Sequence, residues 1–187
     1  AAPIINKMIA DGTKLDLPAG KFPTGGVIWI RDKTRFVLSG QGQDQTKVYS
    51  PKGVPSAMIQ AYKSPNTLIR DLTLEGNFRD EGFGLNWTGS TPAGTGQPLT
   101  ETDVPQGSAF PRGILFHIGS HNSVAQDIRV IDVAQQAVGV SFADNVWARR
   151  VVNVQRDLLR QYVQWLFQWA DTTGGGCEDC EVRSTYL

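Results

Sequence analysis

Two stretches of the chain carry nearly the same pattern of apolar and polar residues. Residues 122–130 (NSVAQDIRV) and 145–153 (NVWARRVVN) each begin with an asparagine, and superposing them places Ile128 on Val151. Alternation of apolar and polar positions is typical of β-strands. Self-similarity at a short, fixed period is typical of stacked repeats, so the pattern predicts a solenoid of short strands.

The same pattern occurs twice more, and its spacing predicts a long insertion. Aligning all four copies gives a column of Leu72, Ile128, Val151 and Cys180, separated by steps of 56, 23 and 29 residues. The shorter steps fit one coil each, and the longest step corresponds to two coils or to one coil with an insertion. Residues 76–111 lack periodicity and are rich in Gly, Pro, Ser and Thr, which favours an inserted loop.

The two ends of the chain carry different patterns. Residues 3–10 place Ile4, Ile5, Met8 and Ile9 at helical spacing, which predicts a short helix. Short strands bounded by turn residues are expected at three places after it. These are residues 27–30, 35–38 and 47–49. Near the other end, residues 162–171 alternate strictly, which predicts one more strand.

The beginning of the chain resembles a known family. A helix, the segment LPAGKF at 17–22, a short strand and TRFVLSGQGQDQTKV at 34–48 are similar to the start of a right-handed parallel β-helix of the pectate-lyase-like superfamily. The resemblance extends over nearly the whole chain. It implies one all-β domain over 1–187, with the helix over 3–10 capping the first coil and about six coils in total.

The carboxyl-terminal end shows no polar capping segment. An open end of a solenoid exposes apolar surface and unpaired strand edges, which proteins normally cover. We therefore expect the chain to be part of a longer solenoid, an oligomer, or covered there by a second chain.

Composition narrows the choice of partners. Eighteen basic and eighteen acidic residues cancel, which gives no electrostatic reason to expect nucleic acid or an anionic membrane as a partner. No apolar run approaches the ~20 residues that a membrane span needs. The small residues at the start, Ala1 and Ala2, fit a cleaved signal peptide as well as an arbitrary boundary, and we predict a secreted protein. Cys177 and Cys180 are expected to be buried packing residues.

The sharpest candidate site comes from aligning Phe116, Phe142 and Trp169 as core-facing residues of successive coils. This alignment places Asp144 and Asp171 in one outward column, with carboxyl groups roughly 5 Å apart. Such a pair suits a retaining glycosidase. It could also hold Ca²⁺ through hard oxygen ligands, although no cofactor is otherwise expected. The alternative is that both are turn residues that accept backbone hydrogen bonds.

Other polar residues lie near this face. His117 falls on an outward position one coil before Asp144, where it could transfer protons or be an ordinary surface residue. An arginine could neutralise the carboxylate of a uronate, act as the base in a β-elimination as the resemblance implies, or form salt bridges. The remaining candidates are Arg160 for catalysis and Arg112, Gln164, Gln168 and Trp87 for binding substrate.

Taken together, these features predict a carbohydrate-active enzyme that cleaves a polysaccharide by hydrolysis or elimination in a groove along one face. The chain lacks the paired-aspartate and Gly-His-Gly pattern of polygalacturonases and the arginine motif of the lyases, so neither activity is transferred residue by residue. The alternative is a non-catalytic solenoid that binds glycans or forms a trimeric, tailspike-like fibre. A catalytic groove predicts that Asp144→Asn or Asp171→Asn abolishes turnover while folding is retained.

Overall fold

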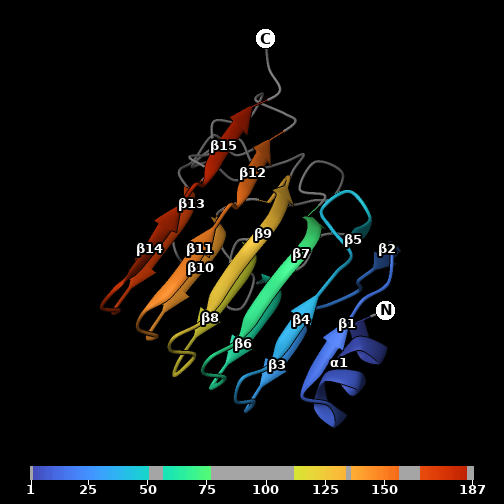
Figure 1. Ribbon diagram of the computed structural model, residues 1–187, viewed down its shortest axis with the longest axis horizontal. Coiled ribbons are helices and arrows are strands. Elements are labelled where there is room, and N and C mark those ends of the chain that lie inside the picture. Colours follow the sequence, from blue (N-terminus) through green and yellow to red (C-terminus); the bar gives the residue numbers. More distant parts are fainter. Residues whose placement is uncertain (1, 51–56, 77–111, 134–135, 156–164, 185–187) are drawn as a thin grey trace, which may run out of the picture.

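The computed structural model describes residues 2–50, 57–76, 112–133, 136–155 and 165–184, which form one helix and fifteen strands (Figure 1). The elements are α1 (Ala2–Asp11), β1 (Lys14–Asp16), β2 (Gly20–Pro23), β3 (Ile28–Arg31), β4 (Val37–Ser39), β5 (Thr46–Tyr49), β6 (Ala57–Tyr62), β7 (Leu68–Glu75), β8 (Arg112–His117), β9 (Val124–Ile131), β10 (Gln136–Ser141), β11 (Val146–Arg149), β12 (Val152–Gln155), β13 (Trp165–Ala170), β14 (Gly175–Glu178) and β15 (Glu181–Ser184).

The strands form two sheets in which every pairing is parallel. The smaller sheet has five strands in the order β13-β10-β8-β6-β3. The larger sheet has ten strands, with a main path of β1-β4-β7-β9-β11-β14 and with β2, β5, β12 and β15 alongside it. Strands from successive coils therefore lie side by side along the molecule (Figure 1). This arrangement confirms the predicted parallel β-solenoid.

The column that defined the sequence repeat is present in the structure. Leu72 of β7 pairs with Ile128 of β9. The registers of β12 with β9 and with β15 place Val151 and Cys180 in the same column. Because β7 and β9 are direct neighbours, the 56-residue step is one coil with an insertion, as predicted. The predicted loop at 76–111 lies outside the described residues except for its first position.

The helix α1 buries only part of its apolar residues. Ile5 and Ile9 are buried against the first coil, while Ile4 and Met8 on the remaining surface are exposed. The helix contacts β1 and β3, the first strands of the two sheets. The predicted helix over 3–10 is confirmed, with one further residue at each end.

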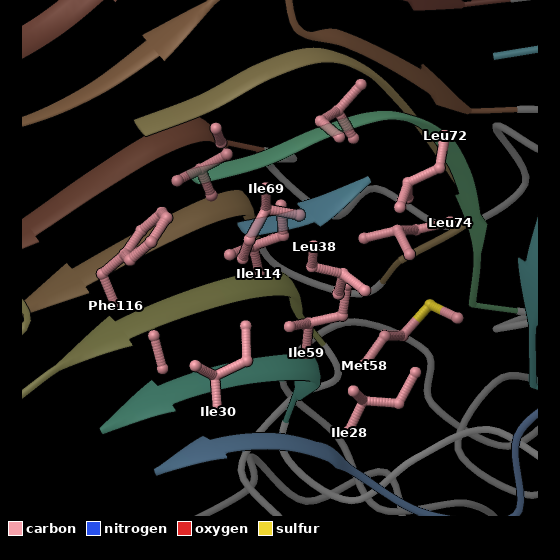
Figure 2. Packing of buried hydrophobic residues seen from close by; sticks show 14 of the residues in the cluster. Ile28, Ile30, Leu38, Met58, Ile59, Ile69, Leu72, Leu74, Ile114 and Phe116 are labelled. Carbon is pink, nitrogen blue, oxygen red and sulfur yellow. The ribbon is translucent and has the colours of Figure 1, made fainter. Parts of the chain in front are cut away.

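The core lies between the two sheets (Figure 2). The side chains of Ile59, Ile114 and Phe116 from the smaller sheet and of Ile69 and Leu72 from the larger sheet belong to one cluster of buried residues, and all five are fully buried. Burying one such side chain contributes about 1.5–3 kcal/mol. Each coil therefore adds both backbone pairing and apolar burial to its neighbours.

A column of left-handed residues turns the chain from the smaller sheet into the larger one. Asn66, Asn122, Asn145 and Gly174 have φ of 58°, 54°, 52° and 67°. Asn and Gly tolerate this conformation better than other residues do. The Asn145 side-chain amide also donates to Asn122 Oδ1 at 2.8 Å, which links adjacent coils. The left-handed turn conformation therefore explains why the repeats in the sequence begin with asparagine.

The predicted core position of Phe142 is wrong. Phe116 pairs with Val140, and Val140 in turn pairs with Trp169. Phe142 follows the strand in a left-handed conformation (φ 53°), and it is 52% exposed. The similar apolar triplets suggested an alignment two residues out of register for this one coil. The correct register leaves Gly119 as one additional residue in the turn of the preceding coil.

Candidate functional site

Two rows of residues on the side of the smaller sheet away from the core form the candidate site, which we call the outer face. Three of its positions, Gln60, Leu115 and Gly139, are nevertheless buried. Core-facing residues of neighbouring strands are in register, so the outward residues between them are in register too. One row runs through Trp29, Gln60, Leu115, Gly139 and Gln168. The other runs through Arg31, Tyr62, His117, Ser141 and Ala170.

Rings and a guanidinium group contact one another across the outer face. The ring centroids of Tyr62 and His117, on adjacent strands, are 5.8 Å apart with tilted planes. His117 also meets Phe142 edge-on, with centroids 6.3 Å apart. The guanidinium carbon of Arg31 lies 4.6 Å from the Trp29 ring centroid and 5.6 Å from that of Tyr62. The outer face therefore presents flat rings and positive charge, as carbohydrate-binding surfaces use.

His117 is set up to accept a proton. Burial lowers the pKa of its imidazole, the backbone of Ser141 opposes this shift, and the positive charge of Arg112 lowers the pKa further. The imidazole is therefore largely neutral at pH 7. Its buried Nδ1 has no hydrogen-bond partner among the described residues. Because Nδ1 is buried, a substrate could reach only Nε2, which makes Nε2 the candidate general base of this neutral imidazole.

Arg112 lies at the start of β8, on the same face. Its Nε donates a hydrogen bond to Gln136 Oε1 on the next strand, and burial lowers the pKa of its guanidinium group. Gly139 leaves room for this side chain, because a Cβ at that position would lie only 3.1 Å from Arg112 Cδ. Its side chain lies against Gly139, and its charge is near enough to lower the pKa of His117. The role of Arg112 in binding stays a prediction.

Asp144 is bound in a turn between coils. Its Oδ1 accepts hydrogen bonds from the backbone N–H of Thr173 at 2.7 Å and from Thr173 Oγ1 at 2.9 Å. Its Oδ2 lies 3.4 Å from His121 Nδ1. The two hydrogen bonds from Thr173, the backbone one first, and the weaker influence of His121 lower the pKa of the Asp144 carboxyl group. This is the geometry of a carboxylate that satisfies a turn, which was the alternative left open by the sequence.

Asp171 does not stack on Asp144. The register of β10 with β13 places Asp171 beside Phe142, two positions before the level of Asp144. Asp171 is exposed and has a left-handed conformation (φ 51°). The predicted alignment of the two aspartates is wrong because it depended on Phe142 facing the core. The glycosidase pair and the shared Ca²⁺ site therefore lose their geometric basis, and no group of three or more potential metal ligands occurs among the described residues.

The structure describes only some of the other predicted residues. Arg160, Gln164 and Trp87 lie outside the described residues. Gln168 pairs with Gly139 of β10, and its role in binding stays a prediction. The prediction that both cysteines are buried is wrong, because Cys177 is exposed and Cys180 is only half-buried, although Cys180 packs against the core.

Sequence reasoning missed Trp29, Arg31 and Tyr62. The signal for Tyr62 was available, because the column through Leu72 and Ile128 aligns its coil with that of His117. Placing Tyr62 beside His117 would have required counting Gly119 as one additional turn residue, which only the register of the strands in the structure reveals.

Within the described ranges, no helix is long and apolar enough to cross a membrane.

Comparison of the sequence with protein-family models and with curated proteins gives no match. The structure, in contrast, is similar to solved structures. A proposed glycosyl hydrolase from Parabacteroides merdae superposes with a TM-score of 0.61 at 16% identity, over 98% of this chain and 79% of the other.

Two further similar structures are A-modules of mannuronan C-5 epimerases from Azotobacter vinelandii. The module of AlgE4 has a TM-score of 0.59 at 16% identity, over 94% of this chain and 46% of that one. The module of AlgE6 has a TM-score of 0.56 at 14% identity, over 97% and 52%. The chain thus spans about half the length of these two modules. At such low identity the likeness establishes the fold alone, a parallel β-helix.

Proposed function

We propose that this parallel β-helix is a carbohydrate-active enzyme that binds an acidic polysaccharide along its outer face. The observation that carries the proposal is the contact between Tyr62 and His117, 5.8 Å between ring centroids, beside the fixed charge of Arg112. The folds of a proposed glycosyl hydrolase and of two mannuronan epimerases support a carbohydrate as the substrate.

The charges favour a sugar that carries a carboxylate. Arg112 and Arg31 are on the outer face, and the described residues of its two rows include no Asp or Glu. Arg binds carboxylates with good geometry through its planar guanidinium group. We therefore assign Arg112 to the carboxylate of the sugar that reacts, where it also withdraws charge from the adjacent carbon.

The reaction begins with proton abstraction. Neutral His117 takes the proton from the ring carbon that bears the carboxyl group, and the negative charge spreads onto the carboxylate held by Arg112. The Tyr62 hydroxyl then supplies a proton. If it protonates the same carbon from the opposite side, the sugar is epimerised. If it protonates the glycosidic oxygen while that carbon–oxygen bond breaks, a carbon–carbon double bond forms and the chain is cleaved by elimination.

Hydrolysis by two carboxylates is less well supported by the geometry. The carboxyl groups of a hydrolase lie roughly 5–10 Å apart. Asp32 and Asp171 occupy equivalent positions just after β3 and β13, at opposite ends of the smaller sheet, so four strand spacings of about 4.8 Å, or roughly 19 Å, separate them. Asp144 is already bound by Thr173.

In the larger sheet, Asp71 and Asp127 are neighbours on β7 and β9, but both Asp127 oxygens accept hydrogen bonds from Arg150. The described residues of the two rows of the outer face include no carboxylate pair.

The experiment compares acidic and neutral polysaccharides, including mannuronan and polygalacturonate. Three signals are followed: ultraviolet absorbance of an unsaturated product, new reducing ends, and uptake of deuterium from heavy water at the carbon beside the carboxyl group. We expect deuterium uptake or ultraviolet absorbance with an acidic polymer. His117→Gln should lower turnover about 10²- to 10⁴-fold, and Tyr62→Phe should also lower it.

Lys21→Gln, an exposed change on β2 in the other sheet, is the control and should leave turnover unchanged. Full activity of His117→Gln, or activity restricted to neutral polymers, would refute the proposal. Binding of intact acidic polymer without any product would instead support the non-catalytic glycan-binding solenoid, for which the line of rings on the outer face also provides a surface.

A further inference from the structure

A cavity of about 300 Å³ lies where α1 meets β3. It is lined by Asn6, Ile9, Ala10, Trp29, Arg31 and Lys33. Trp29 and Arg31 are also the first members of the two rows of the outer face, paired with Gln60 and Tyr62 on the next strand. The cavity therefore continues the outer face at its amino-terminal end.

Two polar residues of the cavity are occupied in holding its walls together. Asn6 accepts a hydrogen bond from the Trp29 backbone at 2.8 Å and donates one to Val27 O at 3.0 Å. Lys33 Nζ donates to the backbone oxygens of Ala10 at 2.6 Å and Gly12 at 3.1 Å, at the end of the helix. These bonds fix helix and strand relative to each other, so the cavity is a preformed feature of the fold.

Trp29 and Arg31 are the two cavity residues whose side chains are available to contact a ligand. The Trp29 ring is half-buried and the Arg31 side chain is exposed. Arg31 makes no ion pair with any described residue, and its guanidinium group rests against the rings of Trp29 and Tyr62. A flat ring beside a positive group with unused N–H donors suits a sugar ring bearing a carboxylate.

We propose that this cavity is an outer subsite that holds one acidic sugar unit of a polysaccharide whose reacting unit lies at His117. The inference rests on the proposed function and deepens it. Two strand spacings, roughly 10 Å, separate β3 from β8. A short oligosaccharide centred on His117 does not reach the cavity, whereas a longer one does. The cavity volume is at the lower end of the range for ligand pockets, which fits one sugar ring.

The test fills the cavity from the helix side. Ala10 is exposed, and the hydrogen bond that it accepts from Lys33 uses its backbone oxygen, so Ala10→Trp should fold. Met8→Trp is the matched control, because Met8 is exposed on α1 but does not line the cavity. Oligomannuronates and oligogalacturonates of graded length are the probes, and kcat/KM is measured for each length.

For the wild-type protein, we expect kcat/KM to rise once the oligomer is long enough to reach the cavity. Ala10→Trp should remove that gain, a loss of roughly 10- to 150-fold on long oligomers, which corresponds to one hydrogen bond to a charged group. Its rate on short oligomers should be unchanged, and Met8→Trp should keep the full length dependence. Arg31→Gln, a change of an exposed side chain, should also reduce the gain and serves as a second variant if Ala10→Trp is unstable.

The two proposals fail differently. If the wild-type protein turns over acidic oligomers and both Ala10→Trp and Arg31→Gln keep its length dependence, the outer subsite is refuted and the proposed function stands. If the wild-type protein neither binds nor converts any of the oligomers, the proposed function is refuted and the subsite with it.

Discussion

The register of β10 on the outer face depends on whether Phe142 faces the core as Phe116 does, and this can be measured. Phe116 is fully buried between the sheets, while Phe142 is 52% exposed in the turn after β10. Replacing a buried Phe by Ala removes its transfer free energy and leaves a cavity, at a typical cost of about 3–5 kcal/mol. Replacing Phe142 removes the edge contact with His117 and should cost about 1 kcal/mol or less.

The assay is urea unfolding of Phe116→Ala, Phe142→Ala and the wild-type protein, followed by a spectroscopic signal. A loss of 3–5 kcal/mol is a large part of the roughly 5–15 kcal/mol by which domains are stable. For a chain of 187 residues it corresponds to a fall in Tm of roughly 6–20 °C. Phe142→Ala should move the midpoint only slightly, and the dependence of free energy on urea should be unchanged in both.

Equal losses for the two variants, or a larger one for Phe142→Ala, would refute the register of β8 with β10. In that case, the residues of β10 would shift by two positions relative to the outer face. Asp144 would then stand beside Asp171, and the two-carboxylate site that the sequence suggested would regain its basis. The experiment thus decides between two active-site hypotheses without a substrate.

Three further predictions test individual residues. Arg112→Gln should move the acidic limb of the pH profile of kcat/KM to higher pH, because the charge that helps lower the pKa of His117 is gone. An unmoved limb would show that the catalytic base is not a group whose pKa Arg112 lowers. Asp144→Asn should lower Tm but leave turnover per folded molecule intact. The loss of stability should be largest above pH ~3.8, because the stabilisation by this carboxylate disappears as the pH falls through its lowered pKa. Abolished turnover would return Asp144 to the catalytic site. Gly175→Ala should destabilise the protein by more than about 1 kcal/mol in urea unfolding, because φ is 99° and the new Cβ would lie 2.1 Å from a backbone oxygen of the neighbouring strand. Gly26→Ala is the control and should not destabilise it, because the space around Gly26 is open.

The sequence predicted the solenoid because stacking requires the same residue types at each level. The column from Leu72 to Cys180 and the turn asparagines are repeated for this reason, and both are present in the structure. Their spacing left open an additional coil or an insertion, and the lack of periodicity in residues 76–111 favoured the insertion, which the direct pairing of β7 with β9 confirms.

The site could not be predicted to the same depth, because it depends on the register within one coil. Phe142 matches Phe116 in residue type, and nothing in the sequence marks Gly119 as an additional turn residue. An alignment two positions out of register exchanged Val140 for Phe142 in the core and brought Asp144 beside Asp171. Tyr62 was overlooked for a related reason, since its neighbour His117 lies beyond the insertion in sequence.

The direct pairing of the coils on either side of residues 77–111 has a consequence for how such a protein can change. Neither the backbone pairing of β7 with β9 nor that of β6 with β8 depends on the number of residues that join Gly76 to Arg112. Doubling the length of a flexible connection costs only about 0.6 kcal/mol. This junction can therefore gain, lose or exchange whole segments while the stack stays the same, which makes it a natural place for diversification and for grafting foreign sequences in the laboratory.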